Sequence, residues 1–77
     1  MQKKEYSQAI MAFERQLNDD MFTSLPRITQ TKVFNNTGYT YLKLNQYPAA
    51  RLNFEKALAN GSKLAAANIT KLDSLMS

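Results

Sequence analysis

Hydrophobic side chains recur along the chain at the spacing of α-helices. Between residues 2 and 18 the apolar positions follow i, i+4, i+7 and i+11: Tyr6, Ile10, Phe13 and Leu17. That spacing places them on one face of a helix. Comparable patterns predict three further helices, over residues 26–45, 47–60 and 63–75. No segment alternates apolar and polar residues for long enough to predict a strand, so we expect an all-α chain of about four helices.

The connector between the first two helices, residues 19–25, is too apolar for a free linker. Three of its side chains are expected to pack back onto the helices: Met21, Phe22 and Leu25. Pro26 suits the first turn of the next helix, because proline there loses no intrahelical hydrogen bond. Ser24 is the candidate N-cap of that helix, since its hydroxyl can accept from a free backbone N–H.

The later turns carry residues that end and begin helices. Residues 45–46 form the turn before the third helix, and Pro48 lies where a helix tolerates proline. Asn60 and Gly61 predict the end of that helix, because glycine accepts the left-handed conformation that closes helices. Ser62 can then cap the fourth helix.

Residues 34–57 have the pattern of a helix-turn-helix repeat unit. The unit is defined by six positions: Phe34, Gly38, Tyr41, Ala50, Phe54 and Ala57. A glycine in the middle of a helix costs about 1 kcal/mol relative to alanine. We therefore expect a neighbouring helix to occupy the space that the missing Gly38 side chain leaves. One such unit cannot bury its own apolar face, so neighbouring helices must stack on both sides of it.

Two segments of the chain are similar to each other, at an offset of 41 residues. Residues 6–17, YSQAIMAFERQL, match residues 47–58, YPAARLNFEKAL. Five identities carry the match, namely Tyr, Ala, Phe, Glu and Leu at corresponding positions. The first predicted helix therefore has the character of the third, and Glu14 and Glu55 are structural positions of the repeat rather than catalytic carboxylates.

On these residues the chain resembles the tetratricopeptide repeat family, whose pattern includes Gly and Tyr on a first helix and Ala and an aromatic on a second. The resemblance implies one domain, residues 1–77, built as an antiparallel helix-turn-helix stack, a fragment of an α-solenoid. Residues 2–18 would be the second helix of a partial repeat and 31–64 a complete repeat. Residues 63–76 would cap the stack or begin another repeat, and the chain is expected to begin inside a repeat.

The sequence departs from the family pattern at three places. Thr37 replaces a leucine, Ser62 replaces the closing proline, and the connector at 19–25 lengthens the usual repeat by about seven residues. An unrelated four-helix bundle with Gly and Ala at its helix crossings is the alternative.

The resemblance also implies a site, because the first helices of such repeats line a groove that holds extended peptides or a partner helix. The groove residues carried over to this chain are Lys32, Asn35, Asn36, Tyr39, Leu42 and Lys43. The amide of Asn36 can both donate to and accept from a peptide backbone. Lys32 and Lys43 could attract carboxylates, and Tyr39 offers an apolar ring with a polar tip. Solvated lysines and an ordinary helical asparagine are the alternative.

Composition narrows the chemistry. The chain has neither cysteine nor histidine, which removes disulfides, thiolate and imidazole metal ligands, and nucleophile–histidine pairs. It has no glycine-rich phosphate loop, so we expect no enzyme, cofactor or metal. The N-terminal residues do not form a signal peptide, and no apolar run approaches the length of a membrane span. The net charge of +4 is scattered along the chain, which makes nucleic acid an unlikely partner.

The expected function is a protein–protein interaction module or adaptor that binds a peptide or helix of another protein. The run at 35–39, Asn-Asn-Thr-Gly-Tyr, is similar to first helices of some family members in bacterial pilus-assembly or secretion proteins, which implies a role in such a complex. The alternative function is a scaffold element that self-associates through exposed repeat faces. The sequence identifies neither the partner nor the compartment.

Overall fold

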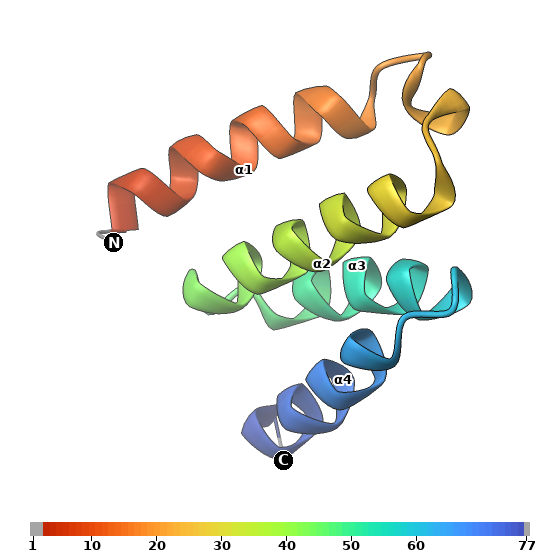
Figure 1. The fold of residues 1–77 in the computed structure, drawn as a ribbon. Coiled ribbons are helices and arrows are strands. Elements are labelled where there is room, and N and C mark those ends of the chain that lie inside the picture. The colour runs from red at the N-terminus through yellow and green to blue at the C-terminus, as the bar shows by residue number, and fades with distance from the viewer. Residues whose placement is uncertain (1–2, 77) are drawn as a thin grey trace.

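The computed structural model describes residues 3–76, and within them the chain is helical and has no strand. Within this range four α-helices follow one another, with one 3₁₀ turn between the first two (Figure 1). Their bounds are α1 Lys3–Leu17, η1 Phe22–Ser24, α2 Arg27–Lys43, α3 Tyr47–Ala59 and α4 Lys63–Met76. The predicted all-α class is confirmed, and each predicted helix is present with ends that differ by at most two residues within the described range. Residue 2, the predicted start of the first helix, lies outside the described residues.

Successive helices run in alternating directions and pack on their neighbours in the chain (Figure 1). The closest pairing is between α2 and α3, followed by α3 with α4 and α1 with α2. The arrangement is therefore an antiparallel helix-turn-helix stack, with the α2–α3 hairpin at its centre. Short turns enforce this order, because the turns between α2 and α3 and between α3 and α4 are only long enough to join antiparallel neighbours.

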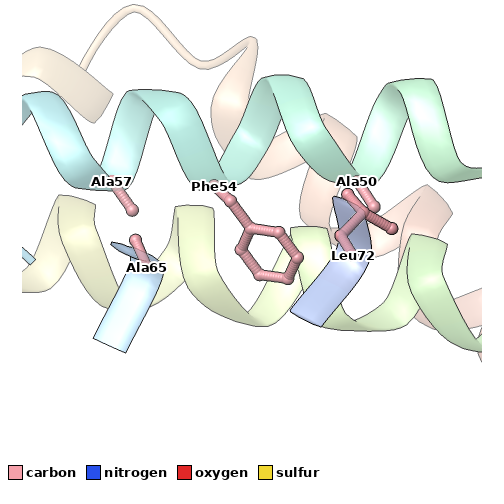
Figure 2. Close-up of a cluster of buried hydrophobic side chains, with 5 residues drawn as sticks. All are labelled: Ala50, Phe54, Ala57, Ala65 and Leu72. Carbon is pink, nitrogen blue, oxygen red and sulfur yellow. The ribbon is translucent and has the colours of Figure 1, made fainter. Parts of the chain in front are cut away.

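The core lies where α3 meets α2 and α4. Five fully buried side chains form it: Ala50, Phe54, Ala57, Ala65 and Leu72. Figure 2 shows the Phe54 ring between two pairs of smaller side chains, Ala57 with Ala65 on one side and Ala50 with Leu72 on the other. The alanines let the helix backbones approach closely, while Phe54 is the largest side chain of the core.

Gly38 lies against the core ring, as the sequence predicts. A Cβ atom at this position would be 2.7 Å from Phe54 Cε1, 2.8 Å from Phe54 Cδ1 and 3.1 Å from the Ala50 carbonyl oxygen. The first two distances are too short for any pair of non-bonded carbon atoms. Glycine is therefore required here because the Phe54 side chain fills the space that any other residue would use.

Two threonines are buried on the inner side of α2, and the hydroxyl group of each makes a hydrogen bond. Thr37 is fully buried, and its hydroxyl donates to the carbonyl of Val33 at 2.7 Å. Thr40 is buried in the same way and donates to the carbonyl of Asn36 at 2.8 Å. The polar atom of each threonine is thus satisfied inside its own helix, and the methyl group remains for packing.

The connector before α2 packs back on the helices, as predicted, through the buried Phe22 and the half-buried Leu25, but not through Met21. Phe22 is buried and contacts Phe34 edge-to-face, with ring centroids 5.4 Å apart. Met21 stays 66% exposed. The prediction that Ser24 caps α2 is wrong: Ser24 belongs to the 3₁₀ turn, and Pro26 occupies the N-cap position with no side-chain hydrogen bond. The reason is that the backbone N–H groups of Ser24 and Leu25 donate to the carbonyls of Met21 and Phe22, which keeps both residues in η1.

The predicted ends of the later helices are confirmed. Pro48 lies in the first turn of α3, and Gly61 follows α3 with φ of 95°. The Ser62 hydroxyl accepts a hydrogen bond from the Ala65 N–H at 3.1 Å, which caps α4. Asn45, between α2 and α3, has φ of 60°, a conformation that asparagine tolerates better than most residues.

Candidate partner-binding surface

Four of the six residues predicted to bind a partner form one exposed row along α2. Lys32, Asn36, Tyr39 and Lys43 follow i, i+4, i+7 and i+11, and all four side chains are exposed. We call these four residues the α2 row. A helix repeats every 3.6 residues, so this spacing aligns them on one side, opposite the residues that pack on α3. The 67% exposed Ile28 continues the row toward the start of the helix.

At the C-terminal end of the α2 row, a lysine ammonium lies over an aromatic ring. The Lys43 ammonium lies 5.2 Å from the centroid of the Tyr39 ring. This contact holds a flat apolar surface and a positive charge next to each other. One turn earlier, the Asn36 amide makes no side-chain hydrogen bond to any residue between 3 and 76. Its donor and acceptor are therefore both available to a ligand.

The other two predicted residues do not belong to the α2 row. Asn35 is buried, and its Nδ2 donates to the Ser62 hydroxyl at 3.0 Å, so it joins α2 to the start of α4. Leu42 is half-buried and packs against the core cluster. Asn35 therefore has a structural role in place of the predicted groove role, because its position on the helix turns it toward the α3–α4 turn.

The charge of α2 has a single sign. Apart from its tyrosines, α2 has three ionisable side chains, Arg27, Lys32 and Lys43, and it contains no Asp or Glu. The acidic residue of α4, Asp73, forms an ion pair with Arg51 of α3. The α2 row is therefore a positive surface whose lysines have no acidic partner on their own helix.

Sequence reasoning overlooked the matching row on α4. A shift of 32 residues maps the buried Val33 and Thr40 of α2 onto the buried Ala65 and Leu72 of α4. The same shift maps the α2 row onto the half-buried Asn68 and three exposed positions of α4: Leu64, Lys71 and Leu75. The similarity of Asn68 and its neighbours to a first helix was visible in the sequence. The burial agrees at these two positions, whereas the buried Asn35, Thr37 and Gly38 of α2 have no buried counterparts in α4.

A hollow lies elsewhere, between α1, η1, α2 and α3. Its volume is about 480 Å³, and apolar and polar groups line it together. Phe22 and Phe34 form one wall, and the Lys56 ammonium lies 5.8 Å from the Phe34 ring centroid. A second hollow of about 370 Å³ lies between the start of α2 and the turn before α4. Neither hollow includes the α2 row, so this surface is exposed rather than enclosed.

A hydrogen bond at the edge of the larger hollow ties α1 to α2. The Tyr41 hydroxyl donates to Glu14 Oε1 at 2.9 Å. Burial, together with the hydrogen bond to and the charge of this carboxylate, raises the pKa of the Tyr41 phenol. The phenol therefore stays protonated and keeps donating at pH values where a free tyrosine begins to ionise.

Replacing Tyr41 by Phe is expected to lower the free energy of unfolding by about 1 kcal/mol at neutral pH, the usual net contribution of such a bond. A phenol whose pKa is raised by folding makes its full contribution to the free energy of unfolding at pH values below its pKa in the unfolded chain, which is about 10. This contribution declines at higher pH, because the unfolded chain then releases the proton more readily than the folded one. Urea unfolding of both proteins from pH 7 to 11 measures this difference.

The matched control for that measurement is Tyr39→Phe, since Tyr39 is 49% exposed and its hydroxyl donates to no described residue. We expect this control to change stability by less than about 0.5 kcal/mol. A Tyr41→Phe effect equal to that of Tyr39→Phe would show that the bond to Glu14 does not stabilise the chain.

Residues 3–76 contain no cluster of three or more Asp, Glu, His or Cys side chains that could hold a metal ion. None of the helices described between residues 3 and 76 is both long enough and apolar enough to cross a membrane. A scan against protein-family models, a search of curated proteins and a search of solved structures each find no match to this chain. The likeness of residues 31–64 to a tetratricopeptide repeat therefore rests on the chain's own residues.

Proposed function

We propose that the chain is a protein–protein interaction module that binds an acidic segment of another polypeptide along the α2 row. Lys32 and Lys43 would attract carboxylates near the two ends of the row. Asn36 would bond the peptide backbone between them, and Tyr39 would give a side chain of the partner an apolar ring to pack on. An extended peptide fits this surface better than a small molecule does, because the row is long and open rather than enclosed.

The observation that carries this proposal is the contrast between the two sides of α2. The inner side packs in the interior of the fold, where Thr37, Gly38 and Thr40 are all buried. The outer side carries four exposed groups of complementary kinds, two cations, an amide and an aromatic ring, and no acid. Aromatic rings are enriched at recognition surfaces, and exposed cations attract a partner of opposite charge.

Two features support the proposed kinship with tetratricopeptide repeats. The contact of Gly38 with Phe54 and Ala50 is the close packing between first and second helices that the family pattern requires. Two of the buried positions of α2, Val33 and Thr40, have buried counterparts in α4, Ala65 and Leu72, which supports a further helix of the same kind after the central hairpin. Membership would make α2 a first helix, the kind that lines the binding face in this family.

Alanine at both Lys32 and Asn36 is expected to weaken binding of an acidic peptide about tenfold or more, because a cation and a backbone-bonding amide are lost together. The probe is a set of fluorophore-labelled peptides, each about 12 residues long, in which Glu and Asp alternate with Leu and Tyr. A second set has Gln and Asn in place of the acids. Fluorescence anisotropy at low and at physiological salt measures the dissociation constants.

Arg15→Ala is the charge-matched control, because Arg15 is an exposed cation on α1, away from the α2 row. This variant should bind as the parent chain does, and circular dichroism should show equal helicity in all variants. Equal binding of the acidic and neutral peptides, or no effect of the Lys32 and Asn36 changes, would exclude the α2 row as an acidic-peptide site.

A further inference from the structure

The larger hollow, between α1, η1, α2 and α3, has the size of a small-ligand site. Its volume of about 480 Å³ lies within the range of roughly 300–1,000 Å³ that ligand pockets occupy. Its apolar lining consists of five side chains: Leu17, Phe22, Phe34, Ala49 and Leu52. The buried Phe22 ring meets the Phe34 ring at an interplanar angle of 68°, so one wall of the hollow is a fixed aromatic corner.

One carboxylate and one ammonium also lie at this hollow, and neither has an ionic partner among the described residues. Glu14 lines the hollow from α1, and its Oε1 accepts the Tyr41 hydrogen bond at 2.9 Å. Lys56 lines it from α3, with its ammonium 5.8 Å from the Phe34 ring centroid. Both ion pairs found among residues 3–76 belong to Arg51. The two charges at the hollow are therefore neutralised neither by each other nor by another residue of this range.

The two charges are held apart along α2. Glu14 is bound to Tyr41, and Lys56 lies over Phe34, and these two α2 positions are seven residues, or about 10 Å, apart along the helix axis. A ligand that neutralises both charges must carry an ammonium and a carboxylate several ångströms apart. In a single α-amino acid both groups are attached to one carbon atom, whereas an extended peptide advances about 3.3–3.6 Å per residue. Two or three residues span the required distance.

The lining also offers hydrogen-bond acceptors that the fold does not use. Asn53 is only 6% exposed, and its Nδ2 donates to the Ala49 carbonyl at 2.9 Å. Gln30 is similar, because its Nε2 donates to the carbonyls of Thr23 and Leu25. The oxygens of both amides accept no hydrogen bond from residues 3–76, and both are accessible. Free acceptors of this kind suit the N–H groups of a peptide backbone.

We propose that the larger hollow binds a free peptide of two or three residues with apolar side chains. The peptide ammonium pairs with the Glu14 carboxylate, and the peptide carboxylate pairs with the Lys56 ammonium. Its backbone N–H groups donate to Asn53 and Gln30, and its side chains pack on the aromatic corner. Because both ends of the ligand are recognised, the end of a longer protein does not satisfy the site. The hollow shares no residue with the α2 row, so this binding is independent of the proposed function.

The first test is a titration of the ¹⁵N-labelled chain with the free tripeptide Phe-Ala-Leu, followed by nuclear magnetic resonance. The amide signals of residues that line the hollow should shift and saturate, with a dissociation constant of about 0.1–1 mM for a ligand of this size. Signals of α4, which does not line the hollow, should stay in place. No saturable shift up to about 10 mM peptide, or shifts confined to helices other than those of the hollow, would overturn the proposal.

Peptides with blocked ends test the recognition of both charges. Acetylation of the amino end should weaken binding about tenfold, because the half-buried Glu14 loses its cation. Amidation of the carboxyl end should weaken it about threefold, since Lys56 is exposed and water screens its ion pair. If both blocked peptides bind as tightly as the free one, the hollow does not recognise free ends and the proposal fails.

Two variants assign each end of the peptide to its residue. Glu14→Gln keeps an oxygen for the Tyr41 hydroxyl and should weaken the free tripeptide about tenfold, but not the acetylated one. Lys56→Gln should weaken the free tripeptide about threefold, but not the amidated one. The matched controls are Glu5→Gln and Lys71→Gln, which remove exposed charges outside the hollow and should not change binding. Equal losses for free and blocked peptides would contradict the assignment.

A further comparison separates this site from the α2 row. Alanine at both Lys32 and Asn36, the change that tests acidic-peptide binding, should leave the affinity for Phe-Ala-Leu unchanged, because neither residue lines the hollow. Conversely, Glu14→Gln should leave acidic-peptide binding unchanged. Urea unfolding of each variant shows whether a loss of binding reflects a loss of fold. If the Lys32 and Asn36 changes abolish tripeptide binding in a folded chain, the tripeptide binds at the α2 row and not in the hollow.

Discussion

Phe54→Ala is expected to leave the chain largely unfolded at 25 °C. The Phe54 ring is the largest of the fully buried side chains and lies in the core where α3 meets α2 and α4 (Figure 2). Truncating a buried phenylalanine costs about 3–5 kcal/mol, through lost burial and through the cavity left behind. A domain of this size has a total stability of roughly the same amount. Far-ultraviolet circular dichroism, with urea unfolding of the parent for reference, measures the loss of helix.

Leu52→Ala is the matched control, because it truncates a large apolar side chain of the same helix that is 53% exposed. It should retain the helical signal and change the free energy of unfolding by less than about 0.5 kcal/mol. If Phe54→Ala kept a cooperative transition within about 1 kcal/mol of the parent, the ring would not be the centre of the core.

Gly38→Val is expected to destabilise the chain by about 3 kcal/mol or more, which makes it the second most damaging of these changes. The first added carbon already meets Phe54 at 2.7 Å, and valine adds two stiff methyl groups beyond it. Overpacking of this kind usually costs about 1–3 kcal/mol, and more where the neighbour cannot move. Phe54 cannot move freely, because it is enclosed by Ala50, Ala57 and Leu72. Thermal and urea unfolding give the measured loss.

The control for the Gly38 change is Ala67→Val, which introduces the same side chain at an exposed position of α4 and should cost only its helix propensity, less than about 0.7 kcal/mol. A double-mutant cycle of Gly38→Ala with Phe54→Leu then identifies the cause. The smaller side chain at position 54 should recover part of the loss caused by Gly38→Ala, with an interaction energy of about 1 kcal/mol. Strict additivity would mean that the ring and the glycine do not constrain each other.

The helical elements were predictable from the sequence because local chemistry decides them. Gly61 has no Cβ and ends α3 at a positive φ, and Ser62 carries a hydroxyl that caps α4, so both functions follow from the residue type. Ser24 has the same hydroxyl, yet it caps nothing in α2. Its backbone is held in the 3₁₀ turn, which buries Phe22 against Phe34, a residue of α2 that is distant from the turn in the sequence.

The candidate site was predictable only in part. The spacing of Lys32, Asn36, Tyr39 and Lys43 is sufficient to place them on one side of a helix, and the structure leaves that side exposed. Asn35 and Asn36 are identical in chemistry and adjacent in the chain, but only Asn36 is exposed. The position of Ser62 decides between them, and that position depends on how α4 begins beside α2. No property of the Asn-Asn pair itself contains this information.

The sequence by itself determined the helices, their order, the antiparallel hairpin at 27–59 and the need for glycine at Gly38. These features depend on periodicity, turn length and side-chain size, all of which are properties of neighbouring residues. Only the tertiary structure decided which apolar faces are covered. Ala9 and Phe13 repeat Ala50 and Phe54 in type and spacing, yet the second pair is buried completely between α2 and α4 and the first pair only in part. Burial depends on what lies opposite a face, and that is fixed by the packing of distant segments rather than by the face itself.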